Sequence, residues 1–188
     1  MCDETWTNGL LMCGYNGRMD ELLRRLDTTP RTMAHLTAEL RDQELDAAEA
    51  GEWSARQILA HLRDDESMVM RMRLVRMLVE DDPLLPDFDE QAWATNRNTS
   101  HDKKESLLAD FMLQRQASLN LLQRLTPEQW ERPGRHEVRG SMTVRDLVER
   151  WADHDDEHVR QFERATGDTL AAVLERRAHP GAESEEKR

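Results

Sequence analysis

Histidines are the residues of this 188-residue sequence whose type and spacing point most directly to chemistry. His154 and His158 are four positions apart, in a stretch whose apolar residues keep a helical period. Residues four apart lie on one face of a helix, with β-carbons roughly 6 Å apart, so two imidazoles can reach one metal ion. Both histidines continue the apolar stripe of Leu147, Trp151 and Phe162. The pattern therefore predicts that both rings point inward.

A third histidine, His61, borders the apolar stripe of another segment, residues 58–62. Asp65 and Glu66 follow it closely. Three neutral imidazoles would leave a divalent ion its full charge and at least one open position, which is typical of a catalytic rather than a structural site. We therefore predict that all three histidines bind one metal ion.

The alternative is a set of histidines that bind no metal. An HxxxH pair alone is not specific, and a lone inward histidine is more often a hydrogen-bonded core residue. Asp65, Glu66 and Asp155 are candidates for orienting a histidine or for moving a proton, although solvated charge is the usual state of acidic residues on a helix. His136 could approach the site from its loop, but a solvent-exposed loop residue is the favoured interpretation.

Four predicted helices must position these side chains. The first follows Asp27-Thr28-Thr29-Pro30, where a hydroxyl cap precedes a proline at the first helical position. The second begins at Ser54, which forms a capping-box pattern with Gln57, and ends at Pro83. The third covers residues 103–125, and the fourth begins after Thr143. The fold class is all-α.

The segments between and beyond these helices complete the predicted organisation. Residues 83–101 lack a helical period and form an unusually long connection, which in a four-helix bundle predicts a crossover that leaves helices 2 and 3 parallel. Residues 131–141 are predicted to be a loop. We expect a flexible extension at residues 1–18, a bundle domain at residues 19–177 and a disordered polar tail at residues 178–188.

The composition argues against several classes of protein. The formal net charge is −12 at pH 7 without any dense basic run, and nucleic-acid affinity comes largely from Lys and Arg. No apolar run approaches the roughly 20 residues of a membrane span, and no secretory signal is evident. Cys2 and Cys13 do not suggest a disulfide framework. We expect a cytoplasmic protein with no membrane or nucleic-acid partner.

Two motifs extend beyond the histidines themselves. In the first, Gly51-Glu52-Trp53-Ser54 leads to Ile58-Leu59-x-His61-Leu62 and Glu66; in the second, Gly140-Ser-Met-Thr143 leads to His154-Asp155-x-x-His158-x-x-Gln161. Together they resemble the DinB/YfiT-like superfamily over roughly residues 19–164. The N-terminal extension with its two cysteines is not part of that pattern.

The resemblance implies a four-helix bundle in which His61, His154 and His158 bind a divalent ion, with zinc and nickel as the leading candidates, and it implies a homodimer. Known activities of the superfamily use a low-molecular-weight thiol such as bacillithiol, mycothiol or glutathione. The leading prediction is therefore a metal-dependent S-transferase that joins a thiol cosubstrate to a small-molecule electrophile. The alternatives are a metal-dependent hydrolase, with Asp65 or Glu66 moving the proton, and a non-catalytic metal-binding dimer.

Overall fold

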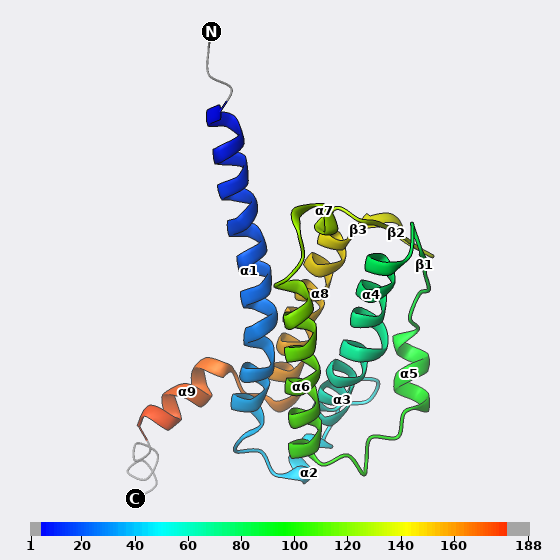
Figure 1. The fold of residues 1–188 in the computed structure, drawn as a ribbon. Helices are drawn as coiled ribbons and strands as arrows, with labels where there is room; N and C mark the ends of the chain where they lie inside the picture. The colour runs from blue at the N-terminus through cyan, green and yellow to red at the C-terminus, as the bar shows by residue number, and fades with distance from the viewer. Residues whose placement is uncertain (1–4, 180–188) are drawn as a thin grey trace, which may run out of the picture.

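The computed structural model describes the backbone of residues 5–179 and the side chains of residues 17–179. Four long helical segments form a bundle (Figure 1). Two of them run downward in that view and two run upward. The downward pair is α1 (Thr5–Thr37) and α8 (Val144–Thr166), and the upward pair is α3–η1–α4 (Ala55–Asp65, Glu66–Met70, Arg71–Val79) and α6 (Lys104–Leu122).

The connection between α4 and α6 returns the chain from one end of the bundle to the other (Figure 1). It contains β1 (Leu84–Leu85) and the short helix α5 (Glu90–Asn96). Because of this return, α4 and α6 run parallel although they are consecutive long helices. The predicted all-α bundle with a long crossover between its second and third helices is confirmed.

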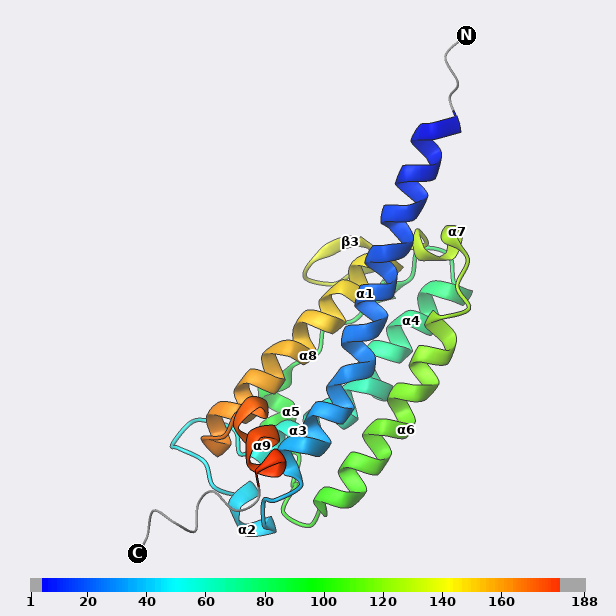
Figure 2. The ribbon, with the colours of Figure 1, turned by 90° about the vertical axis from the view of Figure 1, so that its left-hand side faces the viewer.

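The remaining elements are short. A three-stranded sheet has the order β1-β2-β3, with β1 parallel to β2 and β2 antiparallel to β3. At the lower end in Figure 1, α9 lies against α1, and Figure 2 shows the same neighbours from the side. The bounds are α2 (Asp42–Leu45), α7 (Pro127–Trp130), β2 (Pro133–His136), β3 (Gly140–Thr143) and α9 (Leu170–Ala178).

The prediction of a loop over residues 131–141 is wrong, because β2 and β3 form a hairpin there. Its pairing partner β1 comes from the crossover, about fifty residues earlier, and a local pattern cannot reveal such a partner. Gly134 allows the close approach: a β-carbon at this position would lie 3.0 Å from Met77 Cγ. The hairpin therefore depends on contacts that only the folded bundle supplies.

The predicted start of the first helix after Pro30 is also wrong, because Pro30 lies inside α1. The hydroxyls of Thr28 and Thr29 do not cap a helix; they donate to the carbonyl oxygens of Arg24 and Arg25, four residues earlier. The helical backbone of α1 begins at Thr5. Residues 1–4 and 180–188, which include most of the predicted tail, lie outside the described residues.

The helix that carries His61 begins as predicted. The Ser54 side chain accepts a hydrogen bond from the Gln57 amide at 3.3 Å, and Gln57 Oε1 accepts one from the Ser54 amide at 3.0 Å. We expect Ser54→Ala to lower the free energy of unfolding by about 1 kcal/mol, since it leaves a helix-terminal amide without its acceptor. Urea denaturation would measure the loss. A matched Ser100→Ala variant, changed in an exposed loop, should be unaffected, and an equal effect of the two changes would contradict this role.

Between α3 and α4 the helix widens into the π-helical turn η1, in which the Arg71 amide donates to the Glu66 carbonyl. Such turns hold an extra residue and occur frequently at functional sites. The consecutive residues Asp65 and Glu66, where α3 passes into this turn, are both buried. The α-helical pattern of the sequence gives no indication of this turn.

The apolar core is divided into two clusters at different heights of the bundle. One includes Leu26, Leu74 and Trp151, and the other includes Phe111 and Phe162. Buried polar side chains separate the two clusters on the long helices; they are His61, Glu66, Arg115, Asp155 and His158. Among the described residues, no helix combines the length and hydropathy that a bilayer span requires.

Candidate metal centre

The structure brings the three predicted histidines together in this polar layer. His61 comes from α3, and His154 and His158 come from α8. The Nε2 atoms of His61 and His154 are 3.1 Å apart. One potential ligand atom from each of the three rings lies within 4.8 Å of the others. The rings therefore meet at one point although 93 residues separate His61 from His154.

The environment favours the neutral form of two of the rings. Burial, together with the neighbouring His154, lowers the pKa of His61 to about 2. The same two causes lower the pKa of His158 to about 4. Burial opposes protonation of His154 as well, but Asp155 and Asp65 outweigh it and raise its pKa. Neutral imidazole is the form that binds a metal ion.

The arrangement of donor atoms fits a divalent cation. Two nitrogens at about 2.0–2.1 Å from one ion would lie about 3.3 Å apart in tetrahedral geometry and about 2.9 Å apart at a right angle. The observed separation of 3.1 Å falls between these values. His61 Nδ1 is buried without a hydrogen-bond partner among the described residues. An ion held through Nε2 would place the proton of the His61 ring on this Nδ1 atom.

Neighbouring side chains hold the histidine rings in place. His158 Nδ1 is 2.8 Å from Gln161 Oε1, which leaves Nε2 of His158 for the centre. Trp53 stacks on the His158 ring, with centroids 5.9 Å apart, and lies edge-on to His61 at 5.0 Å. Trp93 from α5 also lies 5.0 Å from His61. Trp53, which precedes α3, and Trp93 of the crossover thus both pack against the histidine rings.

The two predicted catalytic carboxylates have different surroundings. Asp65 Oδ2 lies 3.7 Å from His154 Nε2 and has no hydrogen-bond partner among the described residues. Burial raises the pKa of Asp65 to about 6. Glu66 instead accepts a hydrogen bond from Arg115 Nε at 2.8 Å. The geometry therefore favours Asp65 over Glu66 as a group that can act on a molecule at the centre.

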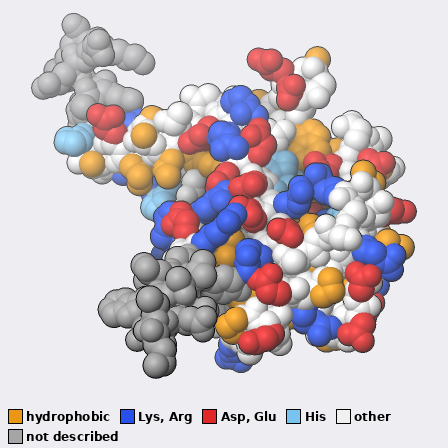
Figure 3. Space-filling model, turned by 90° about the horizontal axis from the view of Figure 1, so that it is seen from above, with side chains coloured by type: hydrophobic (Ala, Val, Ile, Leu, Met, Phe, Trp, Pro, Cys, Tyr) orange, Lys and Arg blue, Asp and Glu red, His pale blue; other side chains and the backbone are white. Residues whose placement is uncertain are grey.

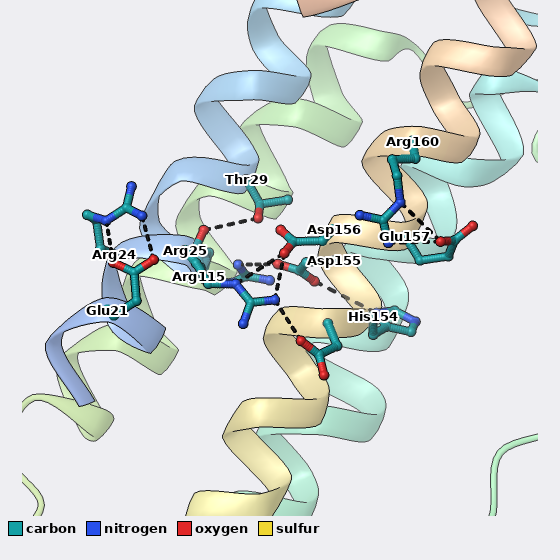
Figure 4. A network of polar contacts seen from close by, with 11 residues as sticks. Glu21, Arg24, Arg25, Thr29, Arg115, His154, Asp155, Asp156, Glu157 and Arg160 are labelled. Atoms are coloured by element: carbon teal, nitrogen blue, oxygen red, sulfur yellow. Dashed lines mark hydrogen bonds and ion pairs between the residues drawn. The ribbon is translucent and has the colours of Figure 1, made fainter. Parts of the chain in front are cut away.

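A buried arginine, which the sequence interpretation missed, connects the centre to the rest of the bundle. Arg115 of α6 donates to Asp155 Oδ2 at 2.6 Å and to the Leu26 carbonyl at 2.6 Å, besides its bond to Glu66. The Leu26 carbonyl lacks its normal helical donor because the residue four positions later is Pro30. Figure 4 shows Asp155 between Arg115 and His154, whose Nδ1 is 3.7 Å from Asp155 Oδ1.

A cavity of about 340 Å³ reaches the centre from one side. His154 and Asp65 are among its lining residues, and so is His136 of β2. The interpretation of His136 as a solvent-exposed loop residue is wrong, because only 4% of its surface is exposed. Seen from the end of the bundle that carries the small sheet, basic and acidic side chains intermingle across the surface (Figure 3).

The fold is a four-helix bundle, and three histidines converge from its second and fourth long helices. These two features place the chain in the class of helical bundles with a candidate metal centre. The profile of the DinB superfamily matches residues 25–162. The chain belongs to the DinB superfamily.

Two proteins of Oceanobacillus iheyensis are similar to this chain over most of both lengths. The protein named "Putative metal-dependent hydrolase OB0413" is 28% identical over 147 residues, which cover 77% of this chain and 83% of that protein. The protein named "Putative metal-dependent hydrolase OB0782" is 27% identical over 143 residues, with 75% and 81% covered.

A solved structure shares the fold. YfiT from Bacillus subtilis, described as "a probable metal-dependent hydrolase with an unusual four-helix bundle topology", superposes with a TM-score of 0.72 at 23% identity. The match covers 80% of this chain and 89% of the YfiT chain. At this identity the likeness establishes the fold alone.

Proposed function

We propose that this protein is a metal-dependent hydrolase of a small-molecule substrate. The observation that carries the proposal is the convergence of His61, His154 and His158 beside a cavity that Asp65 also lines. The names of the two Oceanobacillus relatives support the same activity. The substrate class is an ester or amide, because a cation and a buried carboxylate beside one cavity are suited to adding water to a carbonyl group.

The three histidines would hold the ion through one nitrogen each. A divalent ion so held would polarise a substrate carbonyl and lower the pKa of a bound water to about 7. Gln161 and Trp53 fix the ring of His158, and Asp155 lies beside that of His154, so the donor atoms need little rearrangement.

Asp65 would take the proton that water releases. Its Oδ2 faces the centre without another partner among the described residues, 3.7 Å from His154 Nε2. In the net reaction the oxygen of water bonds to the carbonyl carbon, and the bond from that carbon to the leaving oxygen or nitrogen breaks. The proton held by Asp65 then passes to the leaving group. Trp93 and Phe88 restrict the access of further water on the His61 side.

Asp65→Asn tests this assignment. The variant should keep one equivalent of metal, because Asp65 is not a proposed ligand, while kcat/KM for an activated ester falls about 100-fold or more, as expected when a general base is removed. Both quantities should be measured on protein reconstituted with zinc and, separately, with nickel. Glu66→Gln provides the comparison: since Glu66 binds Arg115, this change should affect stability more than turnover. A larger loss of turnover in Glu66→Gln would contradict the assignment.

Thiol transfer and the homodimer stay predictions that rest on the resemblance. Turnover assays run with and without bacillithiol or glutathione address the first. A reaction that requires the thiol and forms a carbon–sulfur bond would replace hydrolysis as the function of the same centre. Sedimentation analysis addresses the second.

A further inference from the structure

The cavity beside the metal centre has a second, positively charged region. Arg73 of α4, Arg139 of the β2–β3 turn and Arg150 of α8 line it together with His136. Three guanidinium groups thus line one small cavity in a chain of net charge −12. They approach it from three different elements.

These arginines have few partners within the protein. Arg73 is 7% exposed; its Nη2 donates to the Pro86 carbonyl at 2.6 Å, and its Nε is buried without a hydrogen-bond partner among the described residues. Neither Arg139 nor Arg150 forms an ion pair with any described side chain. Leaving a buried guanidinium donor without a partner costs free energy, and binding an anion would remove that cost.

His136 shows that the three charges converge. Burial lowers the pKa of His136, and Arg73, Arg139 and Arg150 all lower it further. The imidazole is then neutral, and its Nδ1 accepts from the amides of Val138 and Arg139 at 3.3 and 3.4 Å. With Nδ1 occupied as an acceptor, the proton lies on Nε2, which makes that atom a further donor.

Four carboxylates also line the cavity: Asp65, Asp87, Glu90 and Asp153. Asp153 is paired with Arg25 at 2.7 Å, and Asp65 and Glu90 lie near His154, whose pKa both of them raise. Asp87, 3.7 Å from His136 Nε2, lies beside the arginines. The end of the cavity that holds the arginines therefore carries more guanidinium groups than carboxylates.

The positions of the arginines limit the size of the ligand. Arg150 precedes His154 by four residues on α8, which is about one helical turn, or roughly 5–6 Å. Arg73 follows Asp65 by eight residues along the neighbouring helix. Arg73 is thus about 12 Å along its helix from Asp65, whereas an anionic group held by Arg150 would lie a few covalent bonds from a group at the metal centre. The volume of about 340 Å³ is near the lower end of small-molecule sites, roughly 300–1,000 Å³.

We infer that Arg73, Arg139 and Arg150 form an oxyanion-binding subsite, and that the substrate is a small molecule carrying a carboxylate or phosphate a few bonds from the carbonyl group that reacts. This inference rests on the proposed function for the reacting group. The anion subsite itself requires only the cavity and its arginines.

Binding experiments test the subsite without turnover. Succinate and inorganic phosphate would be titrated calorimetrically into metal-free and zinc-loaded protein, and the tighter of the two identifies the preferred anion. Arg150→Gln and Arg139→Gln should each weaken binding about tenfold in both forms, and Arg73→Gln should weaken it more. Arg160→Gln, an exposed change of equal charge farther along α8, should have no effect. Because Arg139 and Arg150 are exposed, their variants remain informative even if Arg73→Gln fails to fold.

Two outcomes would overturn the inference: anion binding that is unchanged in the Arg139 and Arg150 variants, or anion binding that occurs only when zinc is present. A paired hydrolysis assay compares 4-nitrophenyl acetate with the mono-4-nitrophenyl ester of glutarate. We expect the anionic ester to have a kcat/KM at least tenfold higher, and Arg150→Gln to remove that preference. Anion binding without any ester hydrolysis would contradict the proposed function alone, whereas equal hydrolysis of both esters would contradict the subsite alone.

Discussion

Replacing His158 with alanine is expected to abolish stoichiometric metal binding. The ring stacks on Trp53 and is held through Nδ1 by Gln161, so its Nε2 is positioned before any ion arrives. Loss of a group that merely orients a ligand typically costs 10–100-fold in metal affinity, and loss of the ligand itself should cost more than about 100-fold. Metal analysis after dialysis should find one equivalent in the natural protein and far less in the variant.

The control for this change is His101→Ala, which removes an exposed histidine outside the cluster. It should retain one equivalent of metal. Thermal unfolding provides an independent readout, because a ligand that binds only the folded state stabilises it by about 2.7 kcal/mol at 100 times its Kd. Zinc should raise the Tm of the natural protein and of His101→Ala, but not that of His158→Ala. Full metal retention by His158→Ala would remove the basis of the proposed function.

The histidine cluster could be predicted from the sequence because its signal is local. His154 and His158 continue the stripe of Trp151 and Phe162, and His61 continues the stripe of Ile58 and Leu62. Each stripe determines which face of its own helix is buried. Since the faces of a bundle share one core, inward polar residues at similar heights must meet.

Other features of the fold could not be predicted because the residues that contact one another are far apart in the sequence. The β1–β2 pairing joins the crossover to the hairpin. The helix α1 continues through Pro30 because Leu26 and Met33, on either side of it, are both fully buried, and because Arg115 supplies the hydrogen bond that the proline removes. A proline that would normally end a helix is tolerated when the helix is packed on both sides of it and another side chain donates to the carbonyl that the proline leaves unpaired.

The sequence does contain an indication that Arg115 is buried. It falls four residues after Phe111 and four before Leu119, so it occupies a core position of its helix. A charged residue at such a position predicts a buried ion pair, and the acidic candidates were the inward residues Glu66 and Asp155. The apolar stripe alone therefore predicts Arg115 as the ion-pair partner of these two carboxylates. It does not predict the contact of Arg115 with the Leu26 carbonyl.

The second large expected effect is a loss of stability of about 3–5 kcal/mol in Arg115→Met. Methionine has a similar length and preserves packing against Phe111 and Trp151, but it leaves the carboxylates of Glu66 and Asp155 buried without their cation. Breaking a buried pair by removing one partner costs about this much, because an uncompensated charge remains in the core. Urea denaturation of the metal-free protein would measure the change.

Two further variants separate the charge effect from packing. The triple variant Arg115→Met, Glu66→Gln and Asp155→Asn removes all three charges, so it should be more stable than Arg115→Met alone although it contains more substitutions. Arg124→Met, an exposed change just beyond α6, should alter stability by less than about 0.5 kcal/mol. A triple variant no more stable than the single one would mean that Arg115 acts mainly through the Leu26 carbonyl. In that case Pro30→Ala, which restores the helical donor to this carbonyl, should recover part of the loss in Arg115→Met.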